Sequence, residues 1–104
     1  MSNYPENYEW LSTKFKDAYE THQKLGVQLQ SVGPLDKKSI HLIQIAGAAA
    51  IRSEGGVHSH VRRALEEKIS ADEIYHALVL LTSTIGFPSV AAALSWARDI
   101  IEGQ

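Results

Sequence analysis

The sequence of 104 residues contains no cysteine, and its formal net charge is only −2. The first absence excludes a disulfide framework, a cysteine-ligated metal site and a thiol nucleophile. The second argues against the basic surface that nucleic-acid binding requires. No apolar run reaches the roughly 18 to 20 residues that span a bilayer, and the first residues lack a signal-peptide pattern. We therefore expect a soluble, cytoplasmic protein of one domain, without a nucleic-acid or membrane partner.

Strand-like alternation of β-branched and polar residues is also missing, whereas Leu, Ala, Glu and Lys are frequent. This pattern predicts an all-α fold. Five helices are expected over about 5–26, 37–52, 57–68, 71–85 and 88–102.

Short-range signals place several helix ends. Asp36 is expected to cap the second helix, and Ser70 with Glu73 forms a capping box for the fourth. Pro88 suits the first turn of the fifth helix. The glycine pair at 55–56 predicts a break between the second and third helices.

The first predicted helix, from Pro5 to Gly26, carries one narrow apolar stripe, which suits packing along a partner helix. The stripe consists of Tyr8, Leu11, Phe15, Ala18, His22 and Leu25. The second and fourth helices are apolar on nearly all sides, and five helices have difficulty hiding both. We expect a homo-oligomer that buries the remaining apolar surface. The alternative is that the first helix covers this surface within one chain.

Polar residues on the apolar second helix are informative, because buried polar groups need partners. His41, Gln44 and Arg52 fall on one line of that helix at about 100° per residue. The line is interpreted as one wall of a small polar pocket. The alternative is a buried polar seam that a neighbouring helix or subunit satisfies.

Two histidines of the third helix lie on its opposite flanks, so that one metal ion cannot easily bind both. They are His58 and His60. His60 has the near-neutral pKa that suits an acid or base, although a structural role is the alternative. Arg63 is the charged residue nearest to the His60 flank. We expect no metal, and leave open a site between subunits that uses His58 or His76.

Four short motifs occur in order at characteristic spacing: Leu35-Asp36-Lys37-Lys38, His60-Val61-Arg62-Arg63-Ala64-Leu65, Ser70-Ala71-Asp72-Glu73-Ile74 and Gly86-Phe87-Pro88. Together they resemble the carboxymuconolactone decarboxylase family, which includes the alkylhydroperoxidase-D-like proteins. The resemblance covers about 34–95, after an N-terminal helix and turn at 1–33. It implies an all-α fold of about five to six antiparallel helices that assembles as a trimer or hexamer.

The peroxidase branch of this family carries a Glu, then C-x-x-C, then a His. At the corresponding positions this chain has His41, Ser53, Gly56 and His60. Peroxide reduction by that route needs a thiolate and a second, resolving thiol. Thiol peroxidase activity is therefore not expected.

The decarboxylase branch also lacks the cysteine pair, and resemblance to it implies an anionic, lactone-like substrate and no cofactor. The predicted catalytic residues are His60 and His41. The predicted substrate-binding residues are Arg52, Gln44, Ser53 and Arg63. Lys68 and Thr84 stand where that branch usually has Gly and Tyr. The alternative function is a non-catalytic helical oligomer that binds a small ligand or a partner.

Overall fold

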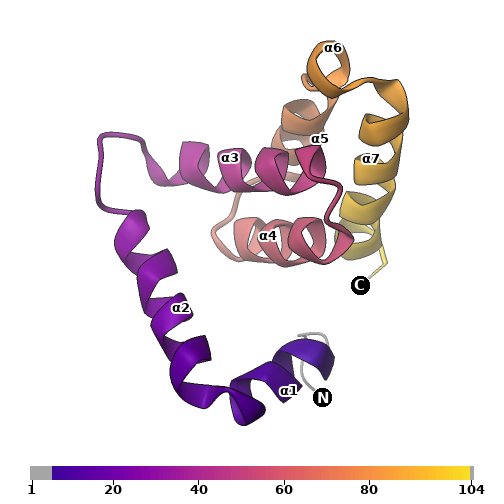
Figure 1. The fold of residues 1–104 in the computed structure, drawn as a ribbon. Helices are drawn as coiled ribbons and strands as arrows, with labels where there is room; N and C mark the ends of the chain where they lie inside the picture. Colours follow the sequence, from indigo (N-terminus) through magenta and orange to yellow (C-terminus); the bar gives the residue numbers. More distant parts are fainter. Residues whose placement is uncertain (1–5, 104) are drawn as a thin grey trace. The chain divides into compact units, whose positions relative to one another are not determined.

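The computed structural model describes residues 6–103, and these residues form helices and turns without a strand. The helices are α1 (Glu6–Lys14), α2 (Lys16–Leu29), α3 (Lys37–Ala50), α4 (Glu54–Glu66), α5 (Ala71–Val79), α6 (Thr82–Ile85) and α7 (Phe87–Ile101) (Figure 1). The all-α prediction is confirmed. None of the described helices is both long enough and apolar enough to cross a membrane.

The chain divides into two compact units, with the boundary between Leu35 and Asp36. The N-terminal unit contains α1 and α2, and the C-terminal unit contains α3 to α7. This boundary lies close to the predicted one between the N-terminal helix and turn (1–33) and the family core (34–95). The single-domain assignment for 1–104 stays a prediction.

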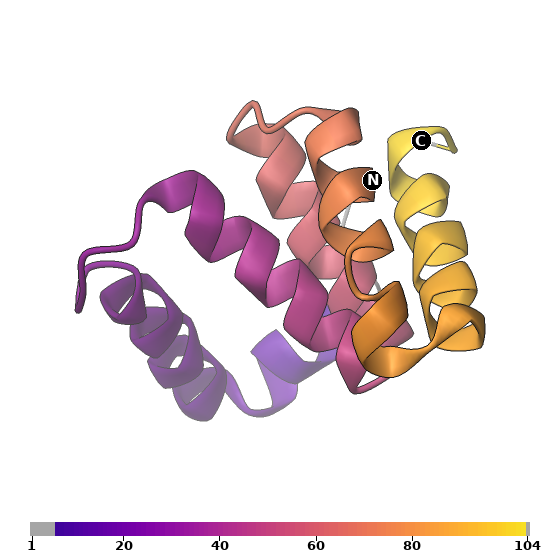
Figure 2. The ribbon, with the colours of Figure 1, turned by 90° about the horizontal axis from the view of Figure 1, so that it is seen from above.

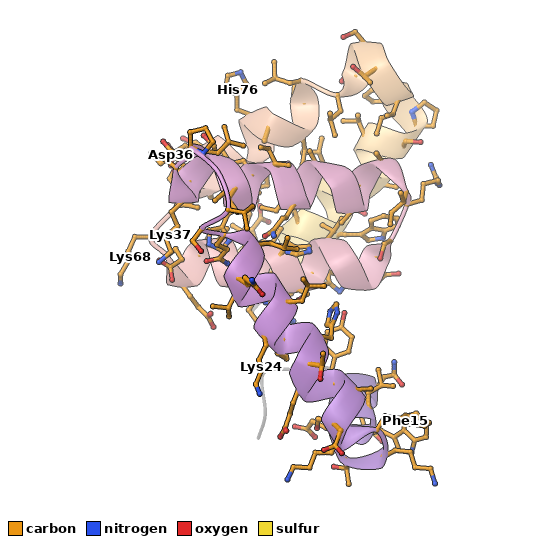
Figure 3. The ribbon with its side chains drawn as sticks, turned by 60° about the vertical axis from the view of Figure 1, so that its left-hand side comes forward. Phe15, Lys24, Asp36, Lys37, Lys68 and His76 are labelled. Carbon is orange, nitrogen blue, oxygen red and sulfur yellow. The ribbon has the colours of Figure 1, made fainter. Side chains whose placement is uncertain are left out.

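The N-terminal unit differs from the one continuous helix predicted between Pro5 and Gly26. Pro5 lies outside the described residues, and the helix is broken at Phe15, whose φ is −124° and ψ 54°. The break allows the Phe15 ring to meet Trp10 edge-on at a centroid distance of 5.8 Å. A continuous helix would turn these two side chains about 140° apart. The second half then continues past Gly26 to Leu29, and Figure 3 shows Phe15 at its beginning.

The C-terminal unit is built around α3 and α4, which run antiparallel and side by side (Figures 1 and 2). Helix α7 packs against α4 and α5, and α5 packs against α3. The core of this unit is aliphatic and consists of Ile45, Ala48, Ala49, Val57, Val61, Ala64, Ile69, Ile74, Leu78, Ala93 and Ala97. Helices α3 and α4 therefore each direct one face into a common core.

The predicted N-caps are confirmed. The Asp36 carboxylate accepts a hydrogen bond of 2.8 Å from the Ser39 backbone N–H at the start of α3. At the start of α5, Ser70 and Glu73 form the reciprocal capping box, with bonds of 3.0 and 3.1 Å. Both motifs act within four residues, so they could be recognised from the sequence.

The turn between α3 and α4 was predicted at the glycine pair 55–56, and this was wrong. The break lies earlier, where Arg52 has a φ of 58° and Ser53 caps α4. Gly56 instead lies in the first turn of α4, where a Cβ atom would stand 2.8 Å from Ser53 Oγ and 3.0 Å from Ala48 Cβ. The glycine permits the close approach of α4 to the end of α3.

The predicted helix at 71–85 is also divided. Helix α5 ends at Val79, and the short α6 begins at Thr82. The Thr82 hydroxyl donates to the Val79 carbonyl at 2.7 Å, and the Leu81 N–H bonds to the Leu78 carbonyl at 3.1 Å. Such local bonds compete with the regular helical pattern. This division and the break at Phe15 together explain why the five predicted helices become seven in the described part of the chain.

Candidate functional site

His41 lies in the first turns of α3 and is directed into the core, with 3% of its surface exposed. Both ring nitrogens are buried, and neither has a hydrogen-bond partner among the described residues. A buried polar group without a partner costs free energy, so it usually has a specific reason to be retained. His41 is therefore the first residue to consider as part of a site.

His60 lies on α4, which runs antiparallel to α3, and its half-buried ring has an enclosed Nδ1 without a hydrogen-bond partner. Burial lowers the pKa of His60 below 6.5, and the positive charges of Arg63 and of protonated His41 lower it further. The effect of His41 on the pKa of His60 indicates that the two rings are near each other. The prediction that His58 and His60 lie on opposite flanks of the helix agrees with the hydrogen bond of His58 to Asp99 on α7.

His41 has a lowered pKa as well. Burial is the main cause, Glu67 opposes it, and the positive charges of Lys37 and Arg63 add to it. Both histidines are consequently neutral at neutral pH, and a neutral imidazole can accept a proton. Arg63 is half-buried on α4 and carries a permanent positive charge next to the two neutral rings.

An ion pair flanks these histidines at the end of the helix pair where α3 begins and α4 ends. Lys37 Nζ lies 2.8 Å from Glu67 Oε1, and Figure 3 shows Lys37 and Lys68 at this end. The hydrogen bond from Lys37 is the largest cause of the lowered pKa of Glu67. We call His41, His60, Arg63, Lys37 and Glu67 together the histidine seam.

The other predicted site residues are placed differently. Arg52 lies eleven residues after His41, which corresponds to about 16 Å along a helix. Its Nη1 donates to Ser89 Oγ at 2.6 Å, at the start of α7. Ser53 Oγ accepts a bond of 3.0 Å from the Gly56 N–H as the cap of α4. The structure thus does not place Arg52 beside His41, and the substrate-binding roles of Arg52 and Ser53 stay predictions.

Gln44 is half-buried on α3, one turn after His41. Residues three apart on a helix lie on neighbouring parts of its surface, so Gln44 borders the face that carries His41. Its predicted role as a pocket wall stays a prediction.

The sequence model of the carboxymuconolactone decarboxylase family matches residues 13–99. The chain belongs to this family. The search of curated proteins found no match. The carboxymuconolactone decarboxylase match confirms the resemblance found over 34–95 and extends it into the N-terminal unit.

Two members of the histidine seam were not singled out from the sequence. Glu67 has no distinguishing pattern in the sequence, and Lys37 was named only as a residue of a family motif. Their pairing depends on the hairpin of α3 and α4, which brings residues 30 positions apart together. The antiparallel arrangement of two adjacent helices was the available clue, because it places the start of the first beside the end of the second.

Proposed function

We propose that this member of the carboxymuconolactone decarboxylase family is a thiol-independent enzyme that acts on an anionic, carboxylated lactone by histidine-mediated proton transfer. The observation that carries the proposal is the pair of buried His41 and half-buried His60, each of which has at least one enclosed ring nitrogen without a hydrogen-bond partner, with the charge of Arg63 acting on both. Family membership supports the substrate class, and no cysteine is needed for this reaction.

The charges of the seam suit an anionic substrate. Arg63 offers a planar guanidinium, which can hold a carboxylate with two parallel hydrogen bonds. A carboxylate bound there would also raise the pKa of both histidines, because it favours their charged form. Substrate binding would thus load a proton onto a ring that is neutral in the free protein.

In the proposed decarboxylation, the bond between the ring carbon and the departing carboxylate breaks, and carbon dioxide leaves. The electron pair of that bond passes into the conjugated lactone carbonyl system, and one proton is added at carbon. His60 is proposed to deliver this proton and to regain one from solvent, with His41 as a second acid or base. Arg63 is proposed to stabilise the negative charge that develops on the lactone.

The test is turnover of a carboxylated muconolactone, followed by the loss of its ultraviolet absorbance and by the release of carbon dioxide. We expect His60→Ala to reduce kcat by at least about 100-fold, within the range for removal of a general acid or base. Arg63→Ala should raise KM, and Arg63→Lys should restore it only in part. The matched control is His76→Ala, because His76 is an exposed histidine on α5.

Each outcome decides between catalysis and binding. Undiminished kcat in His60→Ala, with an unchanged circular dichroism spectrum, would contradict the acid–base role. Wild-type protein that is stabilised by the lactone but never turns it over would favour the alternative, a non-catalytic oligomer that binds a small ligand. Arg52→Ala tests the proposed role of Arg52 in the same assay. This variant should raise KM only if a second site for the substrate carboxylates exists at the turn between α3 and α4.

We also propose that the chain forms a homo-oligomer, a trimer or hexamer, in the cytoplasm. Several large apolar side chains of the C-terminal unit are at least half exposed: Ile43, Ile51, Val79, Leu80 and Phe87. A monomer that displays so many would be prone to associate. Light scattering should find a multimer at micromolar concentration, and Phe87→Lys should weaken it. A wild-type monomer would contradict the assembly.

A further inference from the structure

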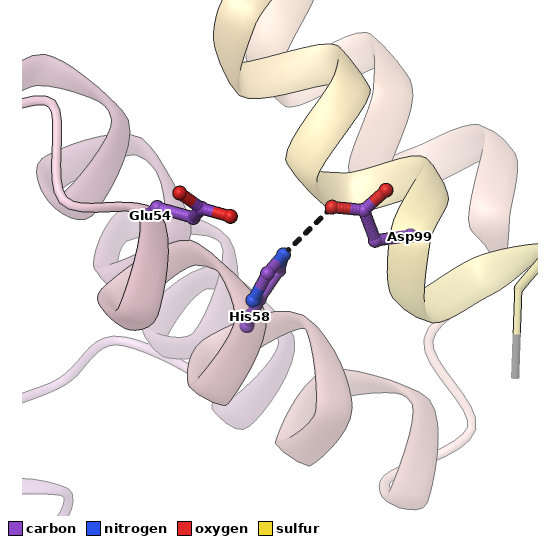
Figure 4. A group of neighbouring side chains, drawn as sticks. All are labelled: Glu54, His58 and Asp99. Carbon is purple, nitrogen blue, oxygen red and sulfur yellow. Dashed lines mark hydrogen bonds and ion pairs between the residues drawn. The ribbon is translucent and has the colours of Figure 1, made fainter. Parts of the chain in front are cut away.

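A second group of polar side chains lies between α4 and α7, separate from the histidine seam. It consists of Glu54 and His58 of α4 and Asp99 of α7 (Figure 4). His58 Nε2 donates to Asp99 Oδ2 at 2.9 Å, because an ionised carboxylate can only accept. One ligand atom from each of the three residues lies within 4.8 Å of the other two. Among the described residues this is the one group of three potential metal ligands so arranged.

We propose that Glu54, His58 and Asp99 bind a divalent transition-metal ion, with Zn²⁺ as the representative, within a single chain. Glu54 and His58 are four residues apart on α4, a spacing that places two ligands on one helical face. Zinc bonds to nitrogen and oxygen are about 2.0 to 2.2 Å, so the ligand atoms around the ion lie about 3 to 3.5 Å apart. The three ligand atoms, which lie within 4.8 Å of one another, would have to move closer together by side-chain rotation to bind the ion.

The chemical types of the three ligands favour a transition-metal ion over Mg²⁺ and Ca²⁺. One imidazole and two carboxylates suit Zn²⁺ and its neighbours in the transition series, whereas Mg²⁺ and Ca²⁺ prefer oxygen ligands alone. The two carboxylates balance a double positive charge, and without a cation they would repel each other. The neighbouring Arg98 is paired with Glu102, with Nη2 to Oε1 at 3.0 Å, so that its charge is directed toward another carboxylate.

The group is also accessible. The side chain of His58 is 21% exposed and that of Asp99 is 56% exposed, so an ion can enter without unfolding the helices. Three protein ligands leave at least one position for water. Because the ligands come from two helices, a bound ion would connect α4 to α7.

The experiment is isothermal titration of Zn²⁺ into the full-length chain, freed of any histidine tag. We expect one zinc ion per chain, and a melting temperature that rises with zinc. His58→Ala, Glu54→Gln and Asp99→Asn should each weaken binding by about tenfold or more. Titration with Co²⁺ should give visible absorption bands in the wild type that His58→Ala removes.

The matched control is His76→Ala. His76 follows Asp72 by four residues on α5, the same spacing as Glu54 and His58, yet no third ligand group joins this pair among residues 6–103. This variant should bind zinc as the wild type does. Equal zinc affinity of wild type and His58→Ala, loss of binding in His76→Ala, or no zinc binding by the wild type would each overturn the proposal.

Discussion

Replacement of His41 by leucine is expected to stabilise the fold while it removes the proposed activity. The side chain is 3% exposed, and both of its ring nitrogens lack a hydrogen-bond partner in the described structure. Burial of such a polar group costs about 1 to 3 kcal/mol in protein mutational data. Leucine has a similar volume, belongs in the aliphatic surroundings of Ile45 and Ala49, and has the better helix propensity. His41→Leu should therefore increase the free energy of unfolding by about 1 to 3 kcal/mol.

The assay is denaturant unfolding at pH 8, where both histidines are neutral, together with thermal melting. A gain of 1 kcal/mol corresponds to about 4 to 8 °C in a domain of this size. His76→Leu is the control, because a change at this exposed position should stay within about 0.5 kcal/mol. A melting temperature of His41→Leu below that of the wild type would refute the reasoning. It would show that water or a neighbouring subunit satisfies the ring, so that His41 supports the fold.

Three further results are expected. Burial lowers the pKa of both seam histidines below their ordinary 6.5. The unfolded chain then binds more protons than the folded chain near these pKa values. The free energy of unfolding, measured with a chemical denaturant, should therefore be highest above about pH 6.5 and fall as the pH drops below it. The fall should be less steep in His41→Leu. Lys68→Gly should increase the stability of the fold by about 1 kcal/mol, measured as a higher melting temperature, because Lys68 has a φ of 67°. Glu66→Gly, within α4, should decrease the stability by a similar amount. Gly56→Ala should lower the melting temperature through its contacts of 2.8 and 3.0 Å, whereas Gly47→Ala, with open space around it, should not.

The end of α4 has a backbone conformation at Lys68 that favours glycine. The Ile69 N–H bonds to the Ala64 carbonyl at 3.1 Å, and the Lys68 N–H bonds to the Leu65 carbonyl at 3.0 Å. These are the two bonds of a Schellman motif, which favours glycine at the residue of positive φ. In the family resemblance, Lys68 stands where the decarboxylase branch usually has glycine. This chain thus keeps the positive φ at the helix end, although lysine fits that conformation less well than glycine does.

Local chemistry explains which parts of the fold could be predicted. The caps at Asp36 and Ser70 each depend on neighbours within three residues, and both were predicted correctly. The breaks at Phe15 and Arg52 were not, because they depend on a ring contact and on the packing of α4 against the end of α3. Helical periodicity carries no information about such contacts.

The same distinction applies to the candidate site. His41 was selected as a polar residue on the apolar second helix, and His60 as a flank histidine with a suitable pKa; the effect of His41 on the pKa of His60 indicates that the two rings are near each other. Arg52 was placed on the line of His41 and Gln44 by extending the helix to residue 52, but α3 ends at Ala50 and the guanidinium bonds to Ser89. Asp99 had no distinguishing pattern, since only the packing of α7 on α4 brings it to His58.

Ser53 and Gly56 have a structural role in this chain. They stand where the resemblance places the two cysteines of the peroxidase branch, yet here the Ser53 hydroxyl caps α4 through the Gly56 N–H. Gly56 leaves no room for a Cβ atom beside that hydroxyl. The two positions thus contribute to the turn between α3 and α4. Reactive groups that remain nearby are the neutral imidazoles farther along the same helix pair, and these can transfer protons but cannot reduce a peroxide as thiols do.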